Sequence, residues 1–283
     1  MYGIVGYGTV GKATGTCFKT NRVKWWAYDT DEKAMASLAK DNVYYQEYME
    51  HTSVVFVCVP TPAKTDVGYE TYHLEKAVDW LVEQEFEGQA VIVSTIGTNT
   101  YSLLKYLVTR RKGKFSLIVC PEFLRSKHAV YDLHVPKGPL VYGPSIRDAR
   151  KRDKLLTALN ARHNYPRIYK AMSPEACSLI KTGTNLALAA KLITASVVYA
   201  SGTNARLSSR ERRYVLDAVF NDRRLRTPQN YHNVAMEGND LGFGGQCLPK
   251  DVEAVSEDMT RPAFVREFAR CLLHTNRWVR GNG

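Results

Sequence analysis

The sequence predicts an α/β protein whose N-terminal part forms a doubly wound, mostly parallel sheet and whose C-terminal part is all-helical. In the first part, short apolar runs alternate with helical patterns, which is typical of a parallel sheet covered by crossover helices. A glycine-rich turn follows the first apolar run, and the pattern becomes helical throughout after about residue 171. We therefore predict two domains, residues 1–170 and residues 171–283.

The composition is that of a soluble globular protein with an unusual charge. Of the 283 residues, 45% are apolar and 24% are charged, but the net charge is +11, which predicts an anionic partner. The six cysteines have no paired spacing, which favours a reduced, cytoplasmic setting. No signal peptide is recognisable, and Lys191 interrupts the longest apolar run, Leu186–Ala200. We therefore expect no membrane-spanning segment.

The first motif is Gly6-x-Gly8-x-x-Gly11, which follows a short apolar strand and opens a helix from about Val10 to Thr20. Gly6 permits a tight turn, Gly8 lets a pyrophosphate approach the backbone, and Gly11 lets the helix pack on the strand. The helix N-terminus, with Thr9 and Val10, would face the phosphates. The pattern predicts a Rossmann-like dinucleotide site.

Asp29 supports this interpretation, because it ends the next apolar strand, Val23–Tyr28, about 20 residues after the glycines. An acid at this place binds the adenosine ribose hydroxyls and repels the 2′-phosphate of NADP, so it favours NAD. The alternative is a nucleotide-free α/β domain with a glycine turn.

The remaining elements of the first domain continue the alternation. The apolar run Val54–Val59 reads as a buried strand that ends in Pro60-Thr61-Pro62, at the sheet edge where such folds bind ligands. Further strands are expected at 90–95, 115–120, 140–143 and 167–169, and helices at 73–84, 100–110 and 147–160.

The second domain should begin with a long helix from Ser173 to about Ser201, with Ser173 as its cap and Pro174 in its first turn. Lys181 and Asn185 lie four residues apart and share one face of it. Three more helices are expected at 209–220, 250–258 and 262–278.

The stretch from Gly242 to Asp251 is the best candidate for chemistry. A glycine-rich turn delivers Cys247, and Lys250 and Asp251 follow. The glycines leave room for a substrate, and a nearby cation favours the nucleophilic thiolate. Asp251 could act as acid, base or orienter. The alternative is a glycine-rich turn with a buried cysteine that caps a helix beginning near Pro249.

This stretch resembles the catalytic-cysteine signature of the UDP-glucose/GDP-mannose dehydrogenase family. Other segments resemble that family in the same order: Val57–Pro62, Ser94-Thr95, Pro121-Glu122-Phe123-Leu124 and Lys181-x-x-x-Asn185. There are also departures. The loop after Thr95 lacks the family's proline, Ser126 replaces an acidic residue, the family's Asn-Glu is absent at about Ser196-Val197, and its interface arginine is not placeable between residues 224 and 247.

The resemblance implies an NAD-dependent nucleotide-sugar 6-dehydrogenase, with UDP-glucose as the expected substrate. It implies that Cys247 forms a thiohemiacetal and then a thioester, and that Lys181 and Asn185 stabilise the oxyanion. It also implies that Asp251, Glu122 and Thr95 order water and move protons; the sequence leaves open which of them is the base. It implies cofactor contacts by Gly6, Gly8, Thr9, Val10, Gly11, Asp29, Val59, Pro60, Thr61, Thr95 and Lys250. It implies substrate contacts by Glu122, Phe123, Leu124, Lys181, Asn185, Gly244 and Gly245. No metal is expected, since no cluster has ligand spacing.

Single motifs also have structural interpretations: Glu122 could pair with Arg125, and Asn185 could be an interhelical polar residue.

Family members have a further nucleotide-binding domain that this sequence lacks, so we expect weaker substrate binding or a partner chain that supplies it. The apolar face of the helix 173–201 and the resemblance both predict a homodimer. The alternatives are a non-catalytic protein that keeps the NAD fold and a simple hydroxy-acid dehydrogenase. Nucleic-acid binding is disfavoured, because the arginines near residue 210 lack interleaved aromatic residues.

Overall fold

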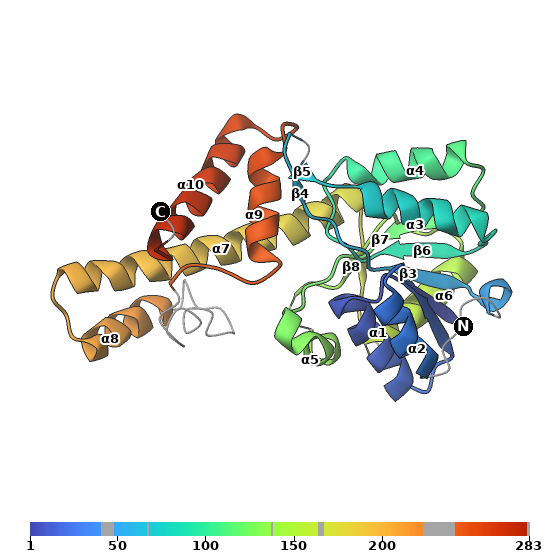
Figure 1. Ribbon diagram of the computed structural model, residues 1–283, viewed down its shortest axis with the longest axis horizontal. Helices are drawn as coiled ribbons and strands as arrows, with labels where there is room; N and C mark the ends of the chain where they lie inside the picture. The colour runs from blue at the N-terminus through green and yellow to red at the C-terminus, as the bar shows by residue number, and fades with distance from the viewer. Residues whose placement is uncertain (41–47, 67, 137, 164–166, 223–240, 282–283) are drawn as a thin grey trace. The chain divides into compact units, whose positions relative to one another are not determined.

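The computed structural model describes the chain except for residues 41–47, 67, 137, 164–166, 223–240 and 282–283. It forms two compact units (Figure 1). The first unit comprises Met1–Thr61 with Tyr69–Lys181, and the second comprises Pro62–Gly68 with Thr182–Gly283. The division falls within one helix, and the domain boundary at residue 170 stays a prediction.

The first unit contains a five-stranded parallel sheet in the order β2-β1-β3-β6-β7. Val5 at the end of β1 lies opposite both Tyr28 of β2 and Val57 of β3, so the winding direction changes beside β1. This confirms the predicted doubly wound sheet, whose ligand site is expected at that point. The strands are β1 (Tyr2–Val5), β2 (Trp25–Tyr28), β3 (Val54–Val57), β6 (Gln89–Ile92) and β7 (Ser116–Val119).

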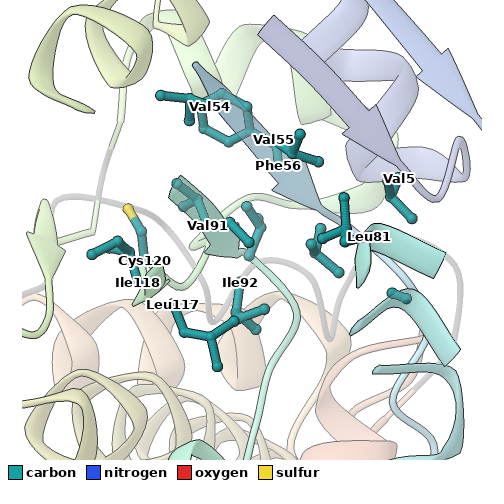
Figure 2. Close-up of a cluster of buried hydrophobic side chains, with 14 of the residues drawn as sticks. Val5, Val54, Val55, Phe56, Leu81, Val91, Ile92, Leu117, Ile118 and Cys120 are labelled. Atoms are coloured by element: carbon teal, nitrogen blue, oxygen red, sulfur yellow. The ribbon is translucent and has the colours of Figure 1, made fainter. Parts of the chain in front are cut away.

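Helices cover both faces of this sheet. Figure 1 shows α3 and α4 on one face and α1 and α2 on the other. The strands are apolar on both faces because both are covered, and Figure 2 shows Phe56, Val91 and Ile118 among the buried side chains of this core. The helices are α1 (Thr9–Thr20), α2 (Glu32–Lys40), α3 (Tyr72–Glu83), α4 (Thr100–Arg110), α5 (Ala129–His134) and α6 (Ala149–Arg162).

Several short elements differ from the prediction. The helices α2 and α5 are not predicted, nor are the single turns of 3-10 helix at Met49–His51 and Ser126–His128. The strand expected at 167–169 is wrong: the structure has β9 at Lys170–Ala171, paired in parallel with β8 at Val141–Tyr142. Before β9, the backbone N–H of Arg167 donates to Asn160 Oδ1 at the end of α6 (2.7 Å), so that segment is tied to a helix end rather than to a neighbouring strand.

The second unit is helical apart from β4 (Ala63–Lys64) and the start of β5 (Gly68–Tyr69). The long helix α7 (Pro174–Asn204) enters it from the first unit, and α8 (Ser209–Phe220), α9 (Leu248–Glu257) and α10 (Ala263–Val279) follow. The predicted cap is confirmed, because Ser173 Oγ accepts from the N–H of Ala176 (3.1 Å). Leu192 of α7, Phe243, Val255 of α9 and Leu272 of α10 belong to one buried apolar cluster.

By length and composition, α7 is able to cross a membrane: it has 31 residues and a window of mean hydropathy 1.4. The sequence was expected to contain no span because Lys191 interrupts the apolar run, but a single charge does not exclude α7 by these criteria. The core helix of a soluble protein also meets these criteria. Within the described residues no other helix does.

Candidate active site

The glycine turn in the first unit has the backbone that a dinucleotide site needs. Gly6 has φ +91, and a Cβ there would lie 2.8 Å from the carbonyl carbon of Cys58, so no other residue fits without a shift. A Cβ at Gly11 would collide with the carbonyl oxygen of Gly6, whereas a Cβ at Gly8 meets nothing within 4 Å. Gly8 thus leaves open space at the N-terminus of α1, where Thr9 and Val10 begin the helix and a phosphate would be stabilised.

Asp29 follows β2 and lies beside this turn. Its Oδ2 accepts from the backbone N–H of Tyr7, inside the glycine motif, and its Oδ1 accepts from the N–H of Asp31 (2.9 Å). The side chain is thereby oriented, yet it stays partly exposed. An oriented carboxylate next to an open glycine turn fits the ribose end of a dinucleotide.

The ends of β3 and β6 bring together the next predicted cofactor residues. Thr61 Oγ1 donates to the carbonyl oxygen of Thr95 (2.7 Å), and Ser94 Oγ donates to that of Val59 (2.6 Å). Pro60 lies between these contacts and is exposed. The missing proline after Thr95 therefore does not separate the two segments.

Glu122 pairs with Arg162 of α6, so the alternative pairing with Arg125 is wrong. Arg125 instead makes two side-chain hydrogen bonds to Asp132, at 2.7 and 3.0 Å. Arg162 is 1% exposed, and its Nε donates to Thr14 Oγ1 in α1 (2.9 Å). A buried guanidinium requires such a partner, because an unpaired charge in the interior costs several kcal/mol.

This pairing determines the charge of Glu122. Burial by itself raises the pKa of Glu122, but Arg162, His163 and the N–H of Phe123 together hold it below its usual value. Burial and the neighbouring Arg162 also lower the pKa of His163 to about 4. Glu122 is thus ionised at neutral pH, which suits an acceptor or orienting group and disfavours a general acid.

Lys181 and Phe123 form a second contact in the first unit. Lys181 is 6% exposed, and its Nζ lies 5.2 Å from the centre of the Phe123 ring, within cation–π distance. Leu124 is partly buried and packs against an apolar cluster that includes Cys17 of α1 and Leu133 of α5. The structure therefore gives Phe123 a contact with a predicted catalytic residue and gives Leu124 a packing role.

In the second unit, Asn185, Lys250 and Asp251 lie together. Asp251 is 1% exposed and Asn185 is 5% exposed. Asn185 Nδ2 donates to Asp251 Oδ2, and Lys250 Nζ lies 2.6 Å from Asp251 Oδ1. Both carboxylate oxygens thus have partners, which fits an orienting role and also fits the interhelical polar role considered for Asn185.

Cys247 immediately precedes α9, as the sequence indicates. Its carbonyl accepts from the N–H of Asp251 in the first turn (2.9 Å), and its thiol is free and partly buried. Gly244 and Gly245 before it are exposed, and a Cβ at Gly245 meets nothing within 4 Å. The cysteine therefore stands at the end of an open turn and at the N-terminus of a helix, as a nucleophile that a substrate must reach would.

Sequence reasoning missed three residues that hold parts of the site. Arg162 pairs with Glu122, whereas Ser196 and Asn276 accept hydrogen bonds from the backbone of Gly242 and Phe243 before Cys247. Arg162 lies two residues beyond the basic helix predicted at 147–160, and the sequence carries no signal that it is buried. Asn276 has a faint signal, as a polar residue facing inwards on α10. The family's interface arginine was not placed between residues 224 and 247, and residues 223–240 of that segment lie outside the described residues. Among the residues that the structure describes, no group of three His, Cys, Asp or Glu side chains is placed to hold a metal.

Comparison with known proteins supports the dinucleotide site. Residues 40–145 match the NAD binding domain of the UDP-glucose/GDP-mannose dehydrogenase family, a range that includes the ends of β3 and β6 and Glu122. The GDP-mannose 6-dehydrogenase of Azotobacter vinelandii is 27% identical over 215 residues, 72% of this chain and 46% of that protein. UDP-glucose 6-dehydrogenase TuaD of Bacillus subtilis is 26% identical, with 96% and 62% covered. The chain thus spans about half to three fifths of these relatives.

Solved structures show the same fold. The UDP-glucose dehydrogenase of Pyrobaculum islandicum superposes with a TM-score of 0.75 at 23% identity, covering 98% of this chain and 68% of that one. The 3-hydroxyisobutyrate dehydrogenase of Mycobacterium tuberculosis has a TM-score of 0.69 at 14% identity, covering 96% and 92%. These structures confirm the predicted fold class, and the match of residues 40–145 to the family's NAD binding domain confirms the family resemblance and NAD as cofactor.

Proposed function

We propose that this chain, whose first unit resembles the NAD-binding domain of the UDP-glucose/GDP-mannose dehydrogenase family, is an NAD-dependent dehydrogenase that oxidises a nucleotide sugar at C6 to the uronic acid. One observation carries the proposal. The second unit places Cys247 one helical turn from a buried Asp251 that is held by Lys250 and Asn185, while the first unit has a glycine turn and an oriented Asp29 that fit NAD.

The proposed reaction has two oxidations with a covalent step between them. The C6 alcohol loses a hydride and a proton and becomes an aldehyde. The Cys247 thiolate adds to the aldehyde carbon and the oxygen takes up a proton, which gives a thiohemiacetal. The thiohemiacetal loses this proton and a second hydride and becomes a thioester. Water then cleaves the C–S bond, releasing the acid and the thiolate. When bound, NAD supplies the hydride acceptor, and the two oxidations consume two molecules of it.

The other residues proposed for the reaction have the properties these steps need. Lys181 brings a buried positive charge and Asn185 an amide donor to the oxyanion of the covalent intermediates. Asp251, Glu122 and Thr95 order the hydrolytic water and move protons. Since Glu122 carries an ion pair with Arg162, its charge serves better to orient water than to donate a proton.

The substrate that we propose is UDP-glucose. The relatives are named for GDP-mannose and UDP-glucose, and the net charge of +11 suits a pyrophosphate. We also propose a homodimer through the second unit, or a partner chain that supplies a nucleotide-binding domain.

The match over 92% of a 3-hydroxyisobutyrate dehydrogenase favours a second candidate, a hydroxy-acid dehydrogenase with one oxidation. In that reaction Cys247 has no covalent role. A protein that binds NAD without catalysis is the remaining alternative.

The test is NADH formation, followed by absorbance, with a panel of UDP-, GDP- and ADP-sugars and with 3-hydroxyisobutyrate as the competing substrate. We expect NADH from a UDP-sugar, and none when NADP replaces NAD. NADH from the hydroxy acid alone would support the second candidate. Tight NAD binding without any NADH, also after addition of a candidate partner chain, would support the non-catalytic alternative.

A further inference from the structure

The loop that leads to Cys247 is held by side chains that the proposed reaction does not use. Asn276 of α10 is 9% exposed and forms a double contact with the backbone of Phe243. Its Oδ1 accepts from the N–H of Phe243 (2.7 Å), and its Nδ2 donates to the carbonyl of the same residue (3.1 Å). One buried amide thus satisfies both backbone groups of one loop residue, as a neighbouring strand would.

A second anchor lies one residue earlier. Ser196 of α7 is fully buried; its Oγ accepts from the N–H of Gly242 (2.6 Å) and donates to the carbonyl of Leu192 (2.9 Å). Gly242 has φ +84, and a Cβ there would collide with Asn276 Oδ1. The loop backbone therefore approaches Asn276 at a distance that only glycine permits.

These anchors fix the orientation of the backbone as well as its position. The Phe243 ring is 1% exposed in the apolar cluster with Leu192 and Val255, but ring burial alone lets the peptide groups on either side rotate. Gly244 and Gly245 follow, both exposed, and Gly245 has φ +80. Glycines transmit little restraint, so the direction in which the chain leaves Phe243 decides where it reaches Cys247, four residues later.

We propose that Asn276 and Ser196 are positioning residues that fix the Gly242–Phe243 backbone and thereby the place and exposure of the Cys247 thiol. The inference rests on the proposed function for its catalytic meaning only. Its physical content is that Cys247 keeps its partly buried place because both ends of the turn are held, one by Asn276 and Ser196 and the other by the first turn of α9.

The experiment measures the alkylation rate of Cys247 by iodoacetamide, with peptide mass spectrometry. The exposed Cys271 on α10 serves as an internal reference in the same sample. The variants are Asn276→Ala, Asn276→Asp and Ser196→Ala. Of these, Asn276→Asp keeps an acceptor for the N–H of Phe243. The matched control is Ser201→Ala. Ser201 is an exposed residue of α7 whose Oγ donates to the carbonyl of Val197, as the Oγ of Ser196 does to the carbonyl of Leu192.

We expect the ratio of the Cys247 rate to the Cys271 rate to rise at least about fivefold in Asn276→Ala and Ser196→Ala, because each leaves buried backbone groups unpaired and frees the loop. Asn276→Asp should lie between these variants and the wild type, and Ser201→Ala should not change. In the enzyme assay, kcat should fall while the KM for NAD stays unchanged, because the glycine turn and Asp29 lie in the other unit.

An unchanged ratio in both variants, with the fold retained, would overturn the inference even if their thermal stability fell. Loss of cooperative unfolding in both would also overturn it, because the residues would then determine the fold and not the loop. Thiol exposure needs no turnover. A raised ratio in a chain that oxidises no nucleotide sugar would therefore keep this inference and reject the proposed function.

Discussion

Arg162 shows how one residue can organise a site without reacting in it. It brings a charge into the interior of the first unit, where it meets Glu122, Thr14 and the face of the Phe56 ring, 5.7 Å from the guanidinium carbon. The same charge, after burial, contributes to lowering the pKa of His163. Glu122 was found from its motif, but Arg162 was not, because an arginine in a basic helix gives no sign of which face turns inwards.

His163 should make the stability of the first unit depend on pH. Its pKa of about 4 in the folded chain lies below the ordinary 6.5 of the unfolded chain. A base whose pKa falls on folding contributes stability that is complete above pH 6.5 and is lost as the pH falls towards 4. The expected loss between pH 7 and pH 5 is about 2 kcal/mol of unfolding free energy.

Urea unfolding followed by the fluorescence of Trp26, which is fully buried in the first unit, measures this loss. His163→Gln should unfold with a flatter pH dependence over the same range. Glu122 does not confuse the comparison, because the pKa of a carboxyl group lowered on folding matters only below about pH 5. An identical slope in wild type and variant would show that His163 is not buried in its neutral form.

At the scale of elements, the longer helices of the chain were predicted best, and α4 has the predicted bounds, 100–110. The residues of α8 agree with the prediction, and α7 begins where Ser173 and Pro174 indicate. The missed helices α2 and α5 are short, and α5 has no side-chain cap hydrogen bond. Strand positions also shifted where a helix end holds the backbone, as Asn160 does for Arg167. Local patterns thus predict elements with their own stop and start signals and miss those fixed by distant contacts.

Ser208 should stabilise α8 through its capping box. Its Oγ accepts from the N–H of Glu211 (3.3 Å), and Glu211 Oε2 accepts from the N–H of Ser208 (2.8 Å). Ser208→Ala should lower the free energy of unfolding by about 1 kcal/mol, measured by urea unfolding followed by circular dichroism. Ser209→Ala, one residue later in the exposed first turn, is the matched control and should change little. Equal losses in the two variants would argue against the cap.

At the scale of the whole molecule, the candidate site divides into two sets of residues, one in each unit. The glycine turn, Asp29, Thr61, Thr95, Glu122 and Lys181 belong to the first unit, and Asn185, Cys247, Lys250 and Asp251 belong to the second. Sequence motifs found members of both sets, because each motif reflects local chemistry. They did not find Asn276 or Ser196, whose function depends on packing between helices distant in the sequence.

The covalent role of Cys247 is the central claim, and it predicts how products depend on that one sulfur. In the decisive measurement, UDP-glucose and NAD are added to the wild type, to Cys247→Ser and to the exposed control Cys271→Ser. The amounts of NADH and uronic acid formed are measured, together with the mass of each protein. Wild type and control should form two NADH per acid. Cys247→Ser should bind NAD and fold, form no acid at turnover, and retain either an ester adduct or the aldehyde, because an alkoxide leaves less readily than a thiolate. Acid production by Cys247→Ser at the wild-type rate would contradict the account.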